Sequence, residues 1–131
     1  MKLAQEMLEA KKALEKLGHE AIVPIDTAEC VENPELQDSL DHCENFADID
    51  LDLDHYSKIS ESDAILVLNY PKYEINGYVG GATLMEIGIA RFLNKKIFLL
   101  FDVPSENDLR YALEIKLAKP IVIKGDLNKI I

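Results

Sequence analysis

Two uninterrupted apolar runs constrain the fold of this chain more than any other feature. Residues 64–68 read AILVL and residues 97–101 read IFLLF, with no polar residue in either run. Such a run is typical of a strand covered on both faces, and strands of that kind belong to parallel sheets. Parallel neighbours need a crossover, and a helical pattern over 83–93 separates the two runs. The sequence therefore predicts an α/β fold on a mostly parallel sheet.

Weaker patterns continue the alternation of helices and strands along the chain, and its length predicts a single domain over residues 1–131. Apolar spacing predicts helices over 1–17, about 46–61 and 105–117, and short strands over 21–23 and 120–123. Gly18 marks the end of the first helix. Residues 26–45 carry Pro34 and many acids without periodicity, so we interpret them as a long loop. The inner face of the 105–117 helix is expected to hold Leu109, Ala112, Leu113 and Leu117.

Composition excludes several classes of partner. The chain is 48% hydrophobic and 29% charged, as globular proteins are, and 14 basic against 24 acidic side chains give a net charge of −10. Such a surface repels nucleic acid polymers and anionic membranes. No apolar run approaches the roughly 18–20 residues that span a bilayer. Cys30 and Cys43 imply no disulfide framework, and we interpret them as reduced thiols in a cytoplasmic protein.

Ligands of open parallel sheets bind outside the carboxyl ends of the strands. That rule selects the residues from Pro24 onward, 69–81 and 101–104 as candidate site segments. The middle segment is the richest, because its glycines let the backbone approach a ligand and the next helix points its positive end there. Its three tyrosines are candidates for stacking on a planar base, namely Tyr70, Tyr73 and Tyr78.

Glu86 is expected in the first turn of the helix that follows the glycines. Thr83-x-x-Glu86 has the spacing of a capping box, in which Thr83 caps the helix and Glu86 bonds back to it. Alternatively, the helix start favours an ionised Glu86, as a carboxylate nucleophile requires. The spacing by itself favours the cap.

The remaining chemistry-bearing residues give no metal site. Four aspartates alternate over 48–54, but a calcium loop starting at Asp50 would place His55 where the turn demands glycine. We interpret this run as a solvated helix face. The histidines lack metal-ligand spacing with the cysteines. His55 lies on the helix that leads into the first apolar run, where a packing role is the default.

Residues 62–69 (SDAILVLN) and 80–90 (GGATLMEIGIA) resemble the nucleoside 2-deoxyribosyltransferase family, which includes deoxynucleoside 5′-monophosphate N-glycosidases. Residues 95–100 continue the likeness, and GHEAIVP over 18–24 is similar to the family's second strand. The resemblance implies a flavodoxin-like three-layer sandwich. It also implies that Glu86 is the nucleophile, attacking the anomeric carbon so that a second base or water resolves a covalent glycosyl-enzyme.

On this resemblance we assign the remaining roles. His55 is a second catalytic candidate, and the substrate-binding candidates are Asn69, Tyr78, Gly80, Gly81 and Thr83. The expected partner is a small nucleoside or nucleotide, with no metal or redox cofactor, and the expected assembly is a homodimer. Relative to the family, an opening strand is absent, so we expect either an upstream segment or an edge covered by another subunit.

Two positions depart from the family pattern. Gly80 and His55 stand where family members commonly carry aspartates. These departures favour an alternative, a non-catalytic nucleotide-binding or sensing domain on the same fold. A phosphoribohydrolase of the lysine-decarboxylase-like family is a further alternative, although residues 78–82 match its loop poorly. A structural interaction module is the last.

Overall fold

A computed structural model describes residues 4–23 and 50–130. Contacts between Cα atoms divide the chain into two compact units, Met1–Lys58 and Ile59–Ile131, and we describe each by itself. The loop expected over 26–45 lies outside the described residues, as do both cysteines and the start of the second helix. Within the described ranges, no helix is both long and apolar enough to cross a membrane.

The first unit contains a helix that ends as expected. Helix α1 (Ala4–Lys16) is followed by Gly18, whose φ is +93°. The Gly18 amide donates to the carbonyl of Glu15 (3.1 Å), and the His19 amide donates to that of Leu14 (3.0 Å). These two bonds form a Schellman motif, which uses glycine because its backbone is left-handed. Helix α4 (Leu51–Glu61) begins in this unit and continues into the second.

The predicted strand over residues 21–23 is wrong. These residues have no strand assignment, and the Ile22 side chain is 48% exposed. A strand forms only where a neighbour pairs with its backbone, and Pro24, which has no N–H, ends the run after three residues. Across the described ranges, the sheet consists of three strands from the second unit.

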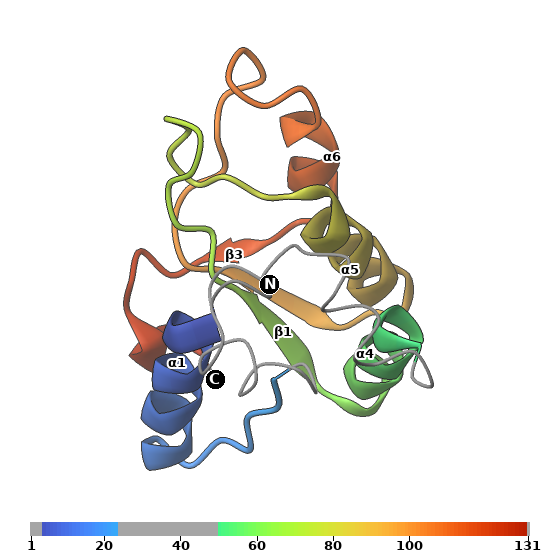
Figure 1. Cartoon of the computed structure of the whole chain (residues 1–131), viewed down its shortest axis with the longest axis vertical. Coiled ribbons are helices and arrows are strands. Elements are labelled where there is room, and N and C mark those ends of the chain that lie inside the picture. The colour runs from blue at the N-terminus through green and yellow to red at the C-terminus, as the bar shows by residue number, and fades with distance from the viewer. Residues whose placement is uncertain (1–3, 24–49, 131) are drawn as a thin grey trace. The chain divides into compact units, whose positions relative to one another are not determined.

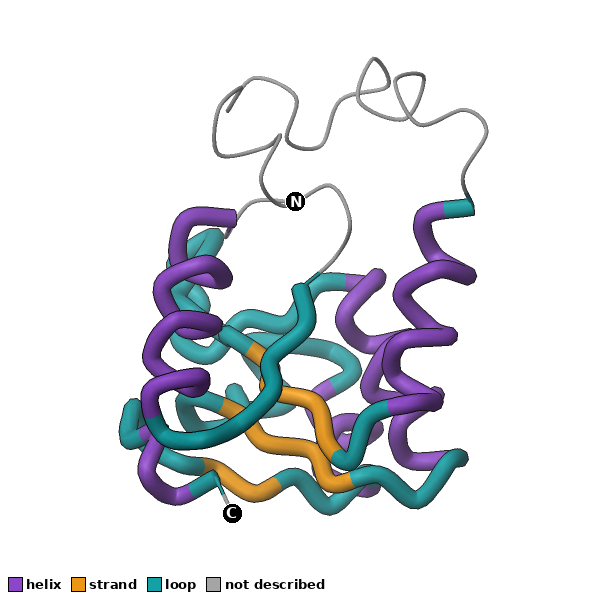
Figure 2. The backbone as a smooth tube through the Cα atoms, turned by 90° about the horizontal axis from the view of Figure 1, so that it is seen from below, coloured by secondary structure: helices purple, strands orange, loops and turns teal. Residues whose placement is uncertain are grey.

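The second unit confirms the α/β class and the parallel sheet. Strands β1 (Ala64–Val67), β2 (Lys96–Leu99) and β3 (Ile121–Val122) lie in the order β1-β2-β3, and both pairings are parallel. Figure 2 shows them as three adjacent orange segments. The described residues form this small open sheet and four α-helices, so the finer flavodoxin-like sandwich stays a prediction.

Helix α5 (Gly81–Phe92) packs against β1 and β2, as a crossover helix must (Figure 1). It buries Ile87 and Ala90. Successive strand residues point to opposite faces, so Phe98 of β2 points away from its neighbours Ile97 and Leu99. Phe98 forms a buried cluster with Leu100 and Ile123. Residues 97–100 are all buried, which confirms that β2 is covered on both faces.

Helix α6 (Ala112–Leu117) is shorter than the predicted helix over 105–117. Ser105 accepts the Asp108 amide on both its carbonyl (3.1 Å) and its Oγ (3.3 Å), and such local bonds compete with a helix. Leu109 and Ala112 are buried as expected. Leu113 and Leu117 are exposed instead, because the inward face carries Ala112 and Ile115, three residues apart.

Candidate functional site

A hollow of about 610 Å³ lies at the carboxyl ends of the three strands. We call it the carboxyl-edge hollow. Its lining comes from residues 70–71 and 76–77 after β1, residues 101–105 and Asp108 after β2, and Lys124 after β3. The segments after β1 and β2 rise from the same end of the sheet in Figure 1. The edge rule had selected both, and the structure brings them together around one hollow.

Asn69 joins the loops behind the hollow. Its side chain is 1% exposed. Its Oδ1 accepts the Phe101 amide (2.9 Å), while its Nδ2 donates to the carbonyls of Phe101 (2.9 Å) and Gly77 (3.4 Å). The carboxamide thus continues the ladder between β1 and β2 beyond their last paired residues. All these described bonds go to backbone, so Asn69 positions the edge. That it also binds substrate stays a prediction.

Gly77 is the glycine that the edge requires. Its φ is +78°, and a Cβ there would lie 2.2 Å from the carbonyl oxygen of Asp102. No side chain fits such a gap, because real Cβ atoms do not approach backbone oxygen so closely. The glycine therefore lets the loop after β1 pack directly on the loop after β2.

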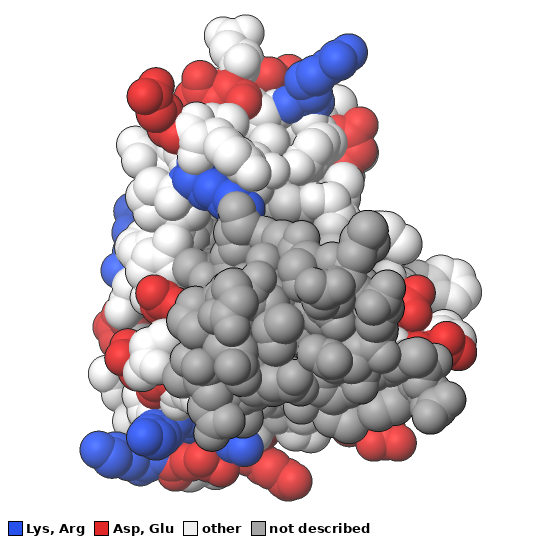
Figure 3. Space-filling model, viewed as in Figure 1, with Lys and Arg blue, Asp and Glu red and all other residues white. Residues whose placement is uncertain are grey.

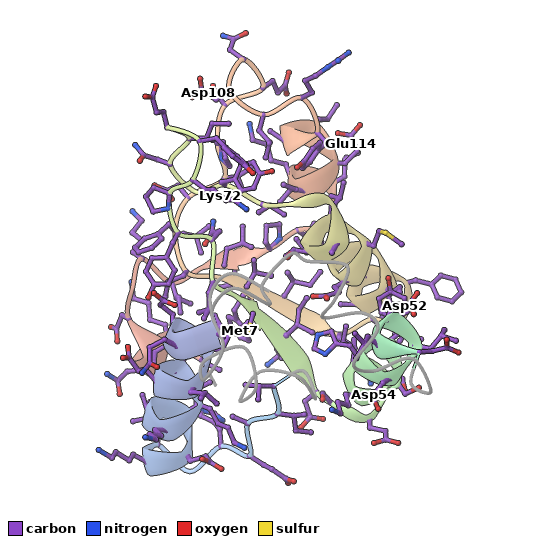
Figure 4. The ribbon with its side chains drawn as sticks, viewed as in Figure 1. Met7, Asp52, Asp54, Lys72, Asp108 and Glu114 are labelled. Carbon is purple, nitrogen blue, oxygen red and sulfur yellow. The ribbon has the colours of Figure 1, made fainter. Side chains whose placement is uncertain are left out.

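The lining combines aromatic and charged groups. The rings of Tyr70 and Phe101 meet edge to face, with centroids 5.6 Å apart. The charged lining residues are Asp102, Asp108 and Lys124, and all three are exposed. Asp108 lies at the same end of the view as Lys72 in Figure 4, and Figure 3 shows both signs of charge at that end. The hollow therefore offers aromatic rings next to hydrogen-bonding carboxylates.

A tyrosine hairpin follows Pro71. Lys72 and Ile75 pair across a turn in which Tyr73 and Glu74 both have positive φ (54° and 60°). The Lys72 Nζ lies 4.9 Å from the ring centroid of Tyr73 and 5.7 Å from that of Tyr78. These cation–π contacts hold the Lys72 ammonium group against the two rings, and Lys72 is not among the residues that line the hollow.

Tyr111, just before α6, links that helix to the segment before α5. Its hydroxyl donates to the carbonyl of Val79. Burial raises the pKa of Tyr111 above its usual 10.0, and the neighbouring Tyr78 hydroxyl raises it further. Tyr78, a predicted substrate-binding residue, is half-buried and contacts Tyr73 edge to face at 5.3 Å. Its ring is therefore part of an aromatic cluster.

The capping box predicted for Thr83 and Glu86 is wrong. Helix α5 begins at Gly81, and its N-cap is Gly80 in an extended conformation, without a side-chain cap. Thr83 is thus the third helical residue and Glu86 the sixth, since Gly81 is the first residue of the helix. The prediction that Glu86 lies in the first turn is also wrong. The field of a helix start falls off within that turn, so it does not single out Glu86.

The remaining predicted site residues, apart from His55, lie in the second unit. A Cβ at Gly80 would meet only Tyr78, at 3.8 Å, and one at Gly81 would meet nothing within 4 Å, so neither glycine is sterically required. Thr83 and Glu86 are half-buried. Of the predicted substrate-binding and catalytic residues, none lines the carboxyl-edge hollow. His55 lies on the part of α4 in the first unit, whereas Glu86 lies in the second.

Sequence reasoning missed three lining residues. Lys124 follows β3, and the same edge rule would have selected it had the segment after 120–123 been included. Asp108 was assigned to a helix, but it belongs to a turn. Ser105 directly follows Pro104, the last residue of the candidate segment 101–104, and it carried a turn signal that the helical pattern obscured.

Comparisons with known proteins do not identify the chain. No protein family, no curated protein and no solved structure matches it. What the site can do must therefore be argued from its own residues and from the resemblance in the sequence.

Proposed function

We propose that this protein binds a small nucleoside or nucleotide at the carboxyl edge of its sheet, and that Glu86 cleaves or transfers the N-glycosidic bond. The observation that carries the binding part is the carboxyl-edge hollow. Its volume of about 610 Å³ is within the range of ligand sites, and its aromatic pair and carboxylates suit a base and a sugar.

The catalytic part is supported by the residues around Glu86. The segment 80–90 resembles the nucleoside 2-deoxyribosyltransferase family, and the helix that carries Glu86 starts directly after the loop that forms the edge. In this proposal the Glu86 carboxylate attacks the anomeric carbon as the bond to the base breaks. The base leaves with the bonding electrons and takes up a proton. Water or a second base then displaces Glu86 from the sugar.

Free base released from deoxynucleosides and their 5′-monophosphates tests this proposal. The wild-type chain should release base, and Glu86→Gln should abolish release, because an amide is a poor nucleophile. Glu114→Gln is the matched control, since Glu114 is an exposed glutamate on α6. Full release by the Glu86→Gln chain would remove Glu86 from the role.

A second candidate is binding without turnover. The observation that favours it is that Glu86 is not among the residues that line the carboxyl-edge hollow. On this alternative, nucleosides bind to the wild-type chain and no base is released from any of them.

We also propose a homodimer formed through α5. The side chains of Met85 and Phe92 on this helix are 59% and 89% exposed. The helix carries one acid, Glu86, and one base, Arg91, so it offers a neutral apolar surface on a chain of net charge −10. Two copies can therefore meet there with little charge repulsion.

A further inference from the structure

The charges around the carboxyl-edge hollow affect whether a nucleoside or its 5′-monophosphate binds there. The charged lining residues are two carboxylates, Asp102 and Asp108, and one ammonium group, Lys124. The nearby Lys72 keeps its charge over the rings of Tyr73 and Tyr78, but it is not among the residues that line the hollow. A phosphate monoester carries up to two negative charges, so it would meet net repulsion from this lining. The net charge of −10 adds to that repulsion.

The uncharged groups of a nucleoside suit the same lining. A base can lie against the edge-to-face pair of Tyr70 and Phe101. Sugar hydroxyls donate to carboxylates, and hydrogen bonds with a charged acceptor are stronger than neutral ones. The turn fixes the backbone of Asp108 through the bonds from its amide to Ser105, and its side chain is exposed.

We infer that the carboxyl-edge hollow selects the unphosphorylated nucleoside over its 5′-monophosphate. This inference rests on the binding part of the proposed function and narrows its substrate class. Asp102 and Asp108 discriminate between the two ligands, because their carboxylates accept hydrogen bonds from sugar hydroxyls and repel a phosphate group.

Calorimetric titration with 2′-deoxyadenosine and its 5′-monophosphate tests the inference. The Glu86→Gln chain is used, so that the proposed turnover does not consume the ligand. We expect the nucleoside to bind at least tenfold more tightly. Asp108→Asn in the same chain should narrow that ratio several-fold, because it removes one repelling charge and keeps the shape. Glu114→Gln makes the same charge change on α6, away from the lining, and should leave the ratio unchanged (Figure 4).

The outcomes separate the inference from the proposed function. If the monophosphate binds as tightly as the nucleoside or more tightly, the inference is wrong and nucleotide binding stands. If the preference exists but neither Asp108→Asn nor Asp102→Asn changes it, the hollow is not its source and the inference is also wrong. If neither ligand binds, the proposed binding function fails, and the inference fails with it.

Discussion

At the scale of single residues, two close contacts hold the loops at the carboxyl edge in place. The Asn69 carboxamide pairs with both backbone groups of Phe101, and Gly77 lets the Asp102 carbonyl come close. Local sequence patterns predict neither contact, because each joins residues more than twenty positions apart in the chain. A strand-ending asparagine and a glycine loop were evident, but a sequence does not say which backbone they contact. The sequence therefore located the edge residues but did not indicate that the Asn69 side chain bonds to the backbone of Phe101 and Gly77.

Gly77→Ala should destabilise the protein strongly, because it adds both backbone strain and a clash. Gly18→Ala is the matched control, since Gly18 also has positive φ but has open space where its Cβ would lie. Strain alone costs about 1–2 kcal/mol at such a position. The clash with Asp102 should add about 1–3 kcal/mol. Urea unfolding measures the loss of unfolding free energy in each variant. Equal losses for Gly77→Ala and Gly18→Ala would mean that the loops after β1 and β2 are not packed as described.

At the scale of elements, long apolar patterns were predictable and boundaries were not. The two apolar runs became β1 and β2, and the short run over 120–123 became β3. Residues 97–100 are buried, whereas in β1 only Val67 is buried and Ala64, Ile65 and Leu66 are half-buried. Helix α5 starts two residues before the predicted Thr83, because Gly80 and Gly81 cap and begin it despite low helix propensity. That shift moved Glu86 out of the first turn. The helix predicted over 105–117 begins only at Ala112. Its first half forms a turn instead, in which the Asp108 amide donates to the side chain of Ser105.

The link between α6 and the segment before α5 predicts a pH dependence. Neutral Tyr111 donates to the Val79 carbonyl, and its pKa is raised above that of an unfolded tyrosine, near 10. The folded state therefore holds this proton more tightly. Its stabilising contribution is complete below pH 10 and is lost as pH rises through the raised pKa.

Tyr111→Phe removes this titration. We expect the difference in unfolding free energy between wild type and variant to be constant from pH 7 to about pH 9.5 and to shrink above about pH 10. Urea unfolding across this range measures it. A difference that stays constant up to pH 11 would contradict the raised pKa.

At the scale of the whole molecule, the excess of acidic over basic side chains limits which molecules can bind. Net charge alone predicted that phosphate polymers are poor partners, and the mixed lining of the hollow extends this reasoning to small ligands. The hollow itself was not predictable in detail, because its walls come from segments after three different strands. Only the rule for parallel sheets indicated where those segments would meet.

The proposed dimer predicts that Phe92→Glu dissociates the protein, because it replaces the most exposed apolar side chain of the shared α5 surface, at the end of that helix, by a charge. Sedimentation equilibrium should show at least a tenfold weaker dimer. Leu117→Glu is the control, since Leu117 is 64% exposed but lies on α6. A wild-type chain that sediments as a monomer, or an unaffected Phe92→Glu dimer, would exclude this interface.

Both candidate functions require a nucleoside at the carboxyl edge of the sheet. Titrating 2′-deoxyadenosine into the ¹⁵N-labelled Glu86→Gln chain, while recording backbone amide shifts, tests this claim most directly. The largest shifts should fall on Gly77, Phe101, Asp102 and Lys124, which line the hollow. Unchanged shifts at saturating nucleoside, or shifts confined to residues away from this edge, would contradict the account.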